Sequence, residues 1–88
     1  MIHDITLIRK NIFDYVGKNT HCDVQKLLPQ TMLFREGIFD SMAFVLLIDY
    51  IEQTFGIKPG DEDLIEENFE SIEAIAKYIH RKMEVTVA

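Results

Sequence analysis

Residues 37–56 read GIFDSMAFVLLIDYIEQTFG, and this stretch decides the fold. A short loop with one glycine leads into an apolar run that closes on Gly56. The run predicts a helix over residues 41–55, because Ser41 is a preferred N-cap and glycine commonly ends helices in the left-handed conformation. Phe44, Ile48, Ile51 and Phe55 recur at spacings of three and four and form one stripe of this helix.

Further apolar side chains lie on other sides of the same helix, namely Leu47 and the three residues Met42, Val45 and Leu46. A chain of 88 residues is too small to surround such a helix completely, so part of its apolar surface is expected to face outward as a docking face. For each of the three residues two interpretations stay open, additional packing in the core and contact with a partner protein.

Two further helices are predicted on either side of this one. Residues 4–16 carry an apolar stripe, with Asp4 as a cap and Gly17 placed to end the helix in a left-handed turn. The last helix is expected to start near Ser71, again a good cap, and its apolar face holds Ile72, Ile75, Ala76, Ile79 and Met83.

The segments between the helices differ in character. Residues 17–40 are long for a loop, but their apolar residues indicate a strap packed across the bundle, and Pro29 prevents a continuous helix. The acidic residues 61–67 predict one short helical turn around Leu64 and Ile65. Residues 84–88 are expected to fray. The prediction is an all-α fold of three main helices and one short helix, with a long loop between the first two, in one domain over residues 1–88 with its core at about 3–83.

The net charge of −6 is unevenly distributed. Residues 1–40 hold five basic and five acidic side chains, whereas residues 41–88 hold four basic and ten acidic ones. An acidic half disfavours nucleic-acid binding and attracts basic partner surfaces. The longest apolar run is too short to span a membrane and no leader is recognised, so a soluble cytoplasmic protein is expected. Cys22 is the one cysteine, which excludes an intramolecular disulfide and a cysteine-based metal cluster.

The segment Gly37-Ile38-Phe39-Asp40-Ser41-Met42 resembles the attachment site of the acyl carrier protein family, an Asp-Ser pair followed by Leu, Met or Ile. The similarity continues through Phe55-Gly56-Ile57, the acidic run at 61–64 and residues 67–72. It covers essentially the whole chain and is strongest over residues 33–81.

The resemblance implies that a magnesium-dependent phosphopantetheinyl transferase moves 4′-phosphopantetheine from coenzyme A onto the Ser41 hydroxyl. The thiol of this arm would carry an acyl or aminoacyl group as a thioester to loading and downstream biosynthetic enzymes. Asp40 would contact the transferase, and Met42, Val45, Leu46 and Asp49 would face partners. The protein itself would be a monomeric carrier and not an enzyme, since no histidine adjoins Ser41 to activate it.

One departure from the family pattern bears on the pathway. Carriers for bacterial fatty acid synthesis usually have acidic residues two and five positions after the modified serine, where this chain has Ala43 and Leu46. It is therefore more similar to stand-alone carriers for specialised pathways, including D-alanyl, aminoacyl and polyketide carriers.

Two other functions compete with that of a carrier. A helical interaction module without a prosthetic group would explain the apolar second helix alone. A small enzyme is disfavoured, because no nucleophile–base pair or metal site can be assembled: Asp61-Glu62-Asp63 begins like a calcium loop, but Ile65 and Glu66 stand where a ligand and a glycine are needed.

Overall fold

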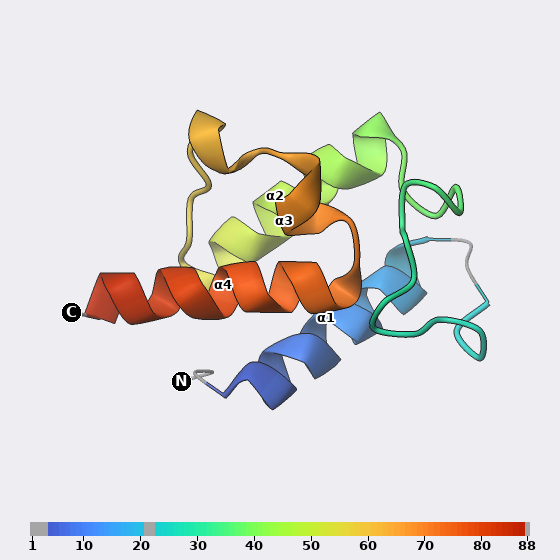
Figure 1. The fold of residues 1–88 in the computed structure, drawn as a ribbon, viewed down its shortest axis with the longest axis horizontal. Coiled ribbons are helices and arrows are strands. Elements are labelled where there is room, and N and C mark those ends of the chain that lie inside the picture. Colours follow the sequence, from blue (N-terminus) through green and yellow to red (C-terminus); the bar gives the residue numbers. More distant parts are fainter. Residues whose placement is uncertain (1–3, 21–22, 88) are drawn as a thin grey trace.

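The computed structural model describes residues 4–20 and 23–87, which fold into four α-helices and one 3-10 turn (Figure 1). The elements are α1 (Ile5–Asn19), α2 (Ser41–Phe55), η1 (Asp61–Asp63), α3 (Glu66–Phe69) and α4 (Ile72–Val87). Because no strand occurs within these ranges, the predicted all-α bundle of three long helices and a short one is confirmed.

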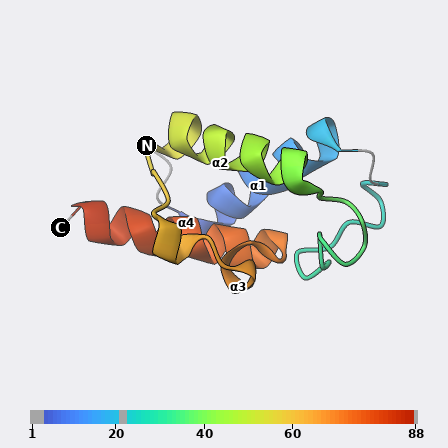
Figure 2. The same ribbon diagram turned by 90° about the horizontal axis from the view of Figure 1, so that it is seen from above.

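The core lies where α1, α2 and α4 meet, and α1 and α4 run alongside each other in both views (Figures 1 and 2). Helices α1 and α4 bury most of the stripe that their spacing predicts. In α2 the prediction was partly wrong: Leu47 is fully buried together with Ile51, and the other members of the predicted stripe, Phe44, Ile48 and Phe55, are only partly buried. The fully buried side chains include Ile8, Ile12 and Val16 of α1, Leu47 and Ile51 of α2, Phe69 of α3, and Ile72, Ile75, Ala76 and Ile79 of α4.

Helix α1 does not end at Gly17, so that prediction was wrong. It continues to Asn19, and Thr20 closes it by donating both its backbone N–H and its hydroxyl to the Val16 carbonyl, at 3.1 and 2.6 Å. A Cβ at position 17 would lie 2.8 Å from Cγ1 of Val24. Glycine therefore stands here because the following segment crosses close to the helix.

The connection between α1 and α2 is the packed strap that its apolar residues predict. Leu27 and Leu33 are buried in the core, whereas Val24 and Leu28 are exposed. Two backbone hydrogen bonds attach the strap to the start of α4: the Leu33 N–H donates to the Glu70 carbonyl at 2.8 Å, and the Glu73 N–H donates to the Pro29 carbonyl at 2.9 Å.

The C-terminus of α2 and the N-terminus of α4 have the caps that the sequence predicts. Gly56 ends α2 in the left-handed conformation with φ 71°, and the Ser71 hydroxyl caps α4 by accepting from the Ala74 N–H at 3.1 Å. Helix α4 then continues through Val87, so residues 84–87 are helical where a frayed tail was expected. Ala88, and residue 3 at the other predicted limit of the core, lie outside the described residues.

Two ionic contacts fasten other elements to α4. The Arg9 guanidinium of α1 donates to both carboxylate oxygens of Glu73, at 2.5 and 3.1 Å, and this lowers the pKa of Glu73. The carboxylate of Asp63 in η1 lies 2.9 Å from Nζ of Lys82 and accepts from the Tyr78 hydroxyl at 3.0 Å. The hydrogen bond to Lys82 is the main reason that the pKa of Asp63 is lowered.

Candidate functional site

Ser41 is the first residue of α2 and is exposed. The loop before it is held in place by its own backbone, since the N–H groups of Ile38 and Phe39 both donate to the Leu33 carbonyl, at 2.9 and 3.0 Å. Gly37 makes this turn possible with φ 74°, a conformation that other residues rarely adopt. The buried Phe39 side chain anchors the loop in the core, so Ser41 stands exposed at a fixed junction.

The cap of α2 is Asp40 and not Ser41, which corrects the sequence-based prediction. Its carboxylate accepts a hydrogen bond from the Ala43 N–H at 2.8 Å, and its carbonyl accepts one from the Phe44 N–H at 3.0 Å. Asp and Ser are about equally good N-caps, so the pair alone does not decide which residue takes that position. With Asp40 as the cap, the Ser41 hydroxyl is not engaged in capping.

The environment of Ser41 suits an attached phosphate ester. A helix N-terminus carries partial positive charge, and the N–H groups of Ser41 and Met42 have no intrahelical acceptor in an α-helix. The first turn of α2 contains no acidic side chain. An exposed hydroxyl beside such N–H groups fits 4′-phosphopantetheine, which would be linked through its phosphate.

The outer face of α2 beside Ser41 is apolar. Met42, Val45 and Leu46 are 67%, 62% and 52% exposed, so all three point away from the core. Asp49, one turn further along, is exposed as well. We call these four residues the α2 outer face.

The structure exposes two further apolar residues for which the sequence predicts no surface role. Leu64 and Ile65, between η1 and α3, are 41% and 47% exposed. The short helical turn expected around them is instead divided into η1 before and α3 after. A signal was present, since both stand in an acidic segment without a helical stripe that would bury them.

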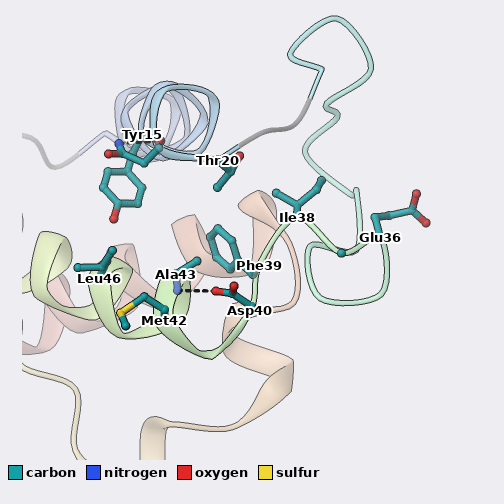
Figure 3. Close-up of a pocket in the computed structure, with 11 residues that line it drawn as sticks. Tyr15, Thr20, Glu36, Ile38, Phe39, Asp40, Met42, Ala43 and Leu46 are labelled. Atoms are coloured by element: carbon teal, nitrogen blue, oxygen red, sulfur yellow. Dashed lines mark hydrogen bonds between the residues drawn. The ribbon is translucent and has the colours of Figure 1, made fainter.

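A hollow of about 430 Å³ opens next to Ser41, between α1, the start of α2 and the loop that precedes it (Figure 3). We call it the α1–α2 hollow. In Figure 3 the Tyr15 ring extends from α1 toward Leu46 of α2, and Thr20 lies near Ile38. The residues that line the α1–α2 hollow are Tyr15, Asn19, Thr20, Glu36, Gly37, Ile38, Phe39, Asp40, Met42, Ala43 and Leu46.

Aromatic rings fill the opposite side of α2. Phe44 lies between Phe34 and Phe69, with ring centroids 5.7 and 5.2 Å apart, and Phe69 lies 5.2 Å from Tyr78. A second hollow of about 380 Å³ lies over these rings, and apart from Glu66 its lining is apolar: Phe34, Phe44, Leu64, Ile65 and Phe69. On the α1 side, Tyr15 and Tyr50 stack with centroids 4.2 Å apart.

The part of the chain that the structure describes contains neither a candidate metal site nor a candidate membrane span. Residues 4–20 and 23–87 contain no cluster of three or more His, Cys, Asp or Glu side chains arranged to hold a metal ion. None of the helices in those ranges is both long and apolar enough to cross a membrane. Cys22 lies outside the described residues.

Similarity to known proteins covers most of the chain. A family model described as "Phosphopantetheine attachment site" matches residues 10–79. A search of curated proteins gives no match. Among solved structures, the chain is similar to one described as "Crystal structure of FAD-dependent dehydrogenase", with 28% identity and a TM-score of 0.65 over 82% of this chain and 97% of that chain.

Proposed function

Because the chain belongs to the phosphopantetheine attachment-site family, we propose that it is a stand-alone carrier that bears 4′-phosphopantetheine on Ser41. The arm's thiol would hold an acyl or aminoacyl group as a thioester and present it to successive enzymes of a biosynthetic pathway. The observation that carries this assignment is the exposure of Ser41 at the start of α2, with its capping role taken by Asp40.

The carrier's own residues position the serine and leave its activation to the transferase. The anchored Phe39 and the Asp40 cap fix the start of α2, so an approaching transferase meets Ser41 in one orientation. Preorganised sites of this kind lose little conformational entropy on binding. Asp40 is also exposed and lies directly beside Ser41, which supports its proposed contact with the transferase.

The α2 outer face is the proposed docking surface for the transferase and for loading enzymes. Its apolar residues expose surface that is costly to leave in water, and Asp49 adds a negative charge at its edge. We infer partners with an apolar centre and a basic rim, because complementary charge speeds encounter and apolar burial slows dissociation.

The pathway is proposed to be a specialised one. Ala43 and Leu46 stand where fatty acid carriers have acidic residues, which reduces the charge available to that class of partner. The similar chain in a structure described as an FAD-dependent dehydrogenase indicates the first enzyme class to test. Such an enzyme would oxidise the carried group, with the two hydrogen equivalents passing to FAD, and the carrier would present the substrate.

Intact mass spectrometry tests the assignment. Co-expression with a broad-specificity phosphopantetheinyl transferase should raise the mass by about 340 Da, the mass of the covalently added group. Ser41→Ala and Ser41→Asn should abolish the gain. Ser71→Ala is the matched control, since Ser71 is the other serine of the chain and caps α4, and this variant should still be modified.

Two results would contradict the proposal. If Ser41→Asn still gains the mass, the attachment site lies elsewhere. If the unaltered chain gains nothing, the alternative of a helical interaction module without a prosthetic group is favoured, since the exposed α2 outer face would remain as its functional surface.

A further inference from the structure

The α1–α2 hollow adjoins the attachment point directly. Asp40 and Met42, the two residues on either side of Ser41, both line it. Its far wall is the last turn of α1, which brings Asn19 and Thr20 opposite the start of α2. A group attached to Ser41 would therefore have the hollow within immediate reach.

The polar side chains on the α1 wall retain hydrogen-bond acceptors. The Asn19 amide donates from Nδ2 to the Tyr15 carbonyl at 2.9 Å, which leaves Oδ1 as an acceptor and the second hydrogen on Nδ2 as a donor. The Thr20 hydroxyl donates to the Val16 carbonyl at 2.6 Å, so its oxygen retains lone pairs for another donor. Such a wall suits an amide-bearing ligand, whose N–H groups can donate to Asn19 and Thr20 and whose carbonyl can accept from Asn19.

The α2 wall supplies the apolar half of the lining. Met42 and Leu46 are largely exposed and line the hollow together with the half-buried Ala43 (Figure 3). A volume of about 430 Å³ lies within the ~300–1,000 Å³ typical of small-molecule sites. The 4′-phosphopantetheine arm matches both walls, since it carries two amide N–H groups, a hydroxyl and a branched hydrocarbon segment.

We propose that the α1–α2 hollow is the resting position of the phosphopantetheine arm on its own carrier, a proposal that rests on the proposed function. The amide N–H groups of the arm donate to Asn19 and Thr20, and its hydrocarbon segment packs on Met42 and Leu46. Tethering at Ser41 gives an effective concentration on the order of mM, so even a site with weak affinity is populated.

The second hollow is a poorer fit for the arm. Its lining is apolar apart from Glu66, and neither neighbour of Ser41 contributes to it. The amides of the arm would lose hydrogen bonds to water there without replacing them, which costs about 1–3 kcal/mol for each unsatisfied group.

The resting position couples docking to release of the arm. Met42 and Leu46 belong both to the α1–α2 hollow and to the α2 outer face. A partner enzyme that covers these two side chains therefore displaces the arm from the hollow at the moment when its own active site is in reach.

Comparison of apo and holo protein by amide ¹H–¹⁵N NMR tests this proposal. Modification is expected to shift the amide signals of residues 40–42, which adjoin the attachment point. It should also shift those of Asn19 and Thr20, which are distant in the chain, and that of Leu46, which lies five residues further along α2. Shifts confined to residues 40–44 in a protein of confirmed holo mass would overturn the resting position and leave the proposed function intact. Absence of the mass gain would overturn both.

A pair of tryptophan variants separates occupation of the hollow from indirect effects. Asn19→Trp fills the hollow from an exposed position and should abolish the holo-specific shift at Leu46. Lys18→Trp is its matched control, being exposed and adjacent on α1 but not part of the lining, and should retain that shift. Equal behaviour of the two holo variants would overturn the proposal, with circular dichroism verifying that both are folded.

Discussion

At the scale of single residues, the Asp40-Ser41 pair divides two tasks between neighbours. Asp40 caps α2 through the Ala43 N–H, and Ser41 is left exposed for the proposed attachment. The sequence indicates where the helix begins, because an Asp-Ser pair precedes an apolar run. It does not indicate which residue caps, because this depends on the loop backbone that Leu33 and the buried Phe39 hold in place.

This division predicts unequal costs for two alanine substitutions. Asp40→Ala should lower the free energy of unfolding by about 0.5–2 kcal/mol, since the cap is lost, whereas Ser41→Ala should change it by no more than ~0.5 kcal/mol. Urea denaturation of the unmodified proteins measures both. Asp40→Asn, which keeps a capping side chain, should remain close to the original stability, and a larger cost for Ser41→Ala than for Asp40→Ala would show that Ser41 is the cap.

Gly17 allows a second prediction at this scale, through its close approach to Val24. Alanine in a helix interior is favoured over glycine by roughly 0.5–1 kcal/mol. In the Val24→Ala background, where the crowding atom is absent, Gly17→Ala should give this stabilisation. In the original chain the gain should be reduced or reversed.

The four proteins of this double-mutant cycle, compared by urea denaturation, give the coupling between the two positions. Additive effects would mean that the strap moves away from α1 without cost and that glycine is not required at position 17.

At the scale of elements, α2 has one buried and one exposed side, and adjacent leucines report on them separately. Leu46→Glu should slow loading of the carrier by its partner enzymes while changing the free energy of unfolding by no more than ~0.5 kcal/mol, because Leu46 is exposed. Leu47→Glu should unfold the protein or destabilise it by several kcal/mol, because Leu47 is fully buried. Thermal unfolding and loading rates followed by mass spectrometry distinguish the two, and a large loss of stability in Leu46→Glu would place that residue in the core.

Helix boundaries were predictable where a cap and a core stripe agree. The C-terminus of α2 and the N-terminus of α4 follow Gly56 and Ser71 as expected. The end of α1 was not predictable, because Gly17 serves a tertiary contact with Val24 and not a turn. Helix α4 passes Met83 because extending a helix by one residue costs far less than nucleating one, so a weak alternating pattern does not stop it.

At the scale of the whole molecule, acid stability depends on the two contacts that fasten α1 and η1 to α4. The pKa values of Glu73 and Asp63 are lowered from 4.5 and 3.8, chiefly by hydrogen bonds to Arg9 and Lys82. A lowered pKa stabilises the folded state above the unfolded value and is lost as pH falls through the folded value. The free energy of unfolding should therefore be steady near neutrality and decline below about pH 4.5.

Urea denaturation from pH 7 to pH 3 measures this decline. Glu73→Gln should be less stable at neutral pH and should lose less stability on acidification than the original chain, because one of the two carboxylates is gone. An unchanged slope in this variant would mean that the contact with Arg9 does not contribute to acid sensitivity.

The α1–α2 hollow shows what the sequence cannot supply at this scale. Its lining comes from α1, from residues 36–40 and from the first half of α2, and no spacing rule relates these segments. Ser41 could be proposed as the attachment site from the sequence because its signal runs along the chain, an Asp-Ser pair before a helix followed by the downstream pattern of the family. The walls of the hollow depend on the angle at which α1 approaches α2, which only the packed core determines.

The stacked rings of Tyr15 and Tyr50 have a practical consequence for spectroscopy. The chain has three tyrosines and no tryptophan, so the phenol rings dominate its near-ultraviolet emission. Two of these rings bridge α1 and α2, and one of them also lines the α1–α2 hollow. Any event that separates or twists the two helices should register in this emission, so the protein has a built-in optical probe that needs no dye or label.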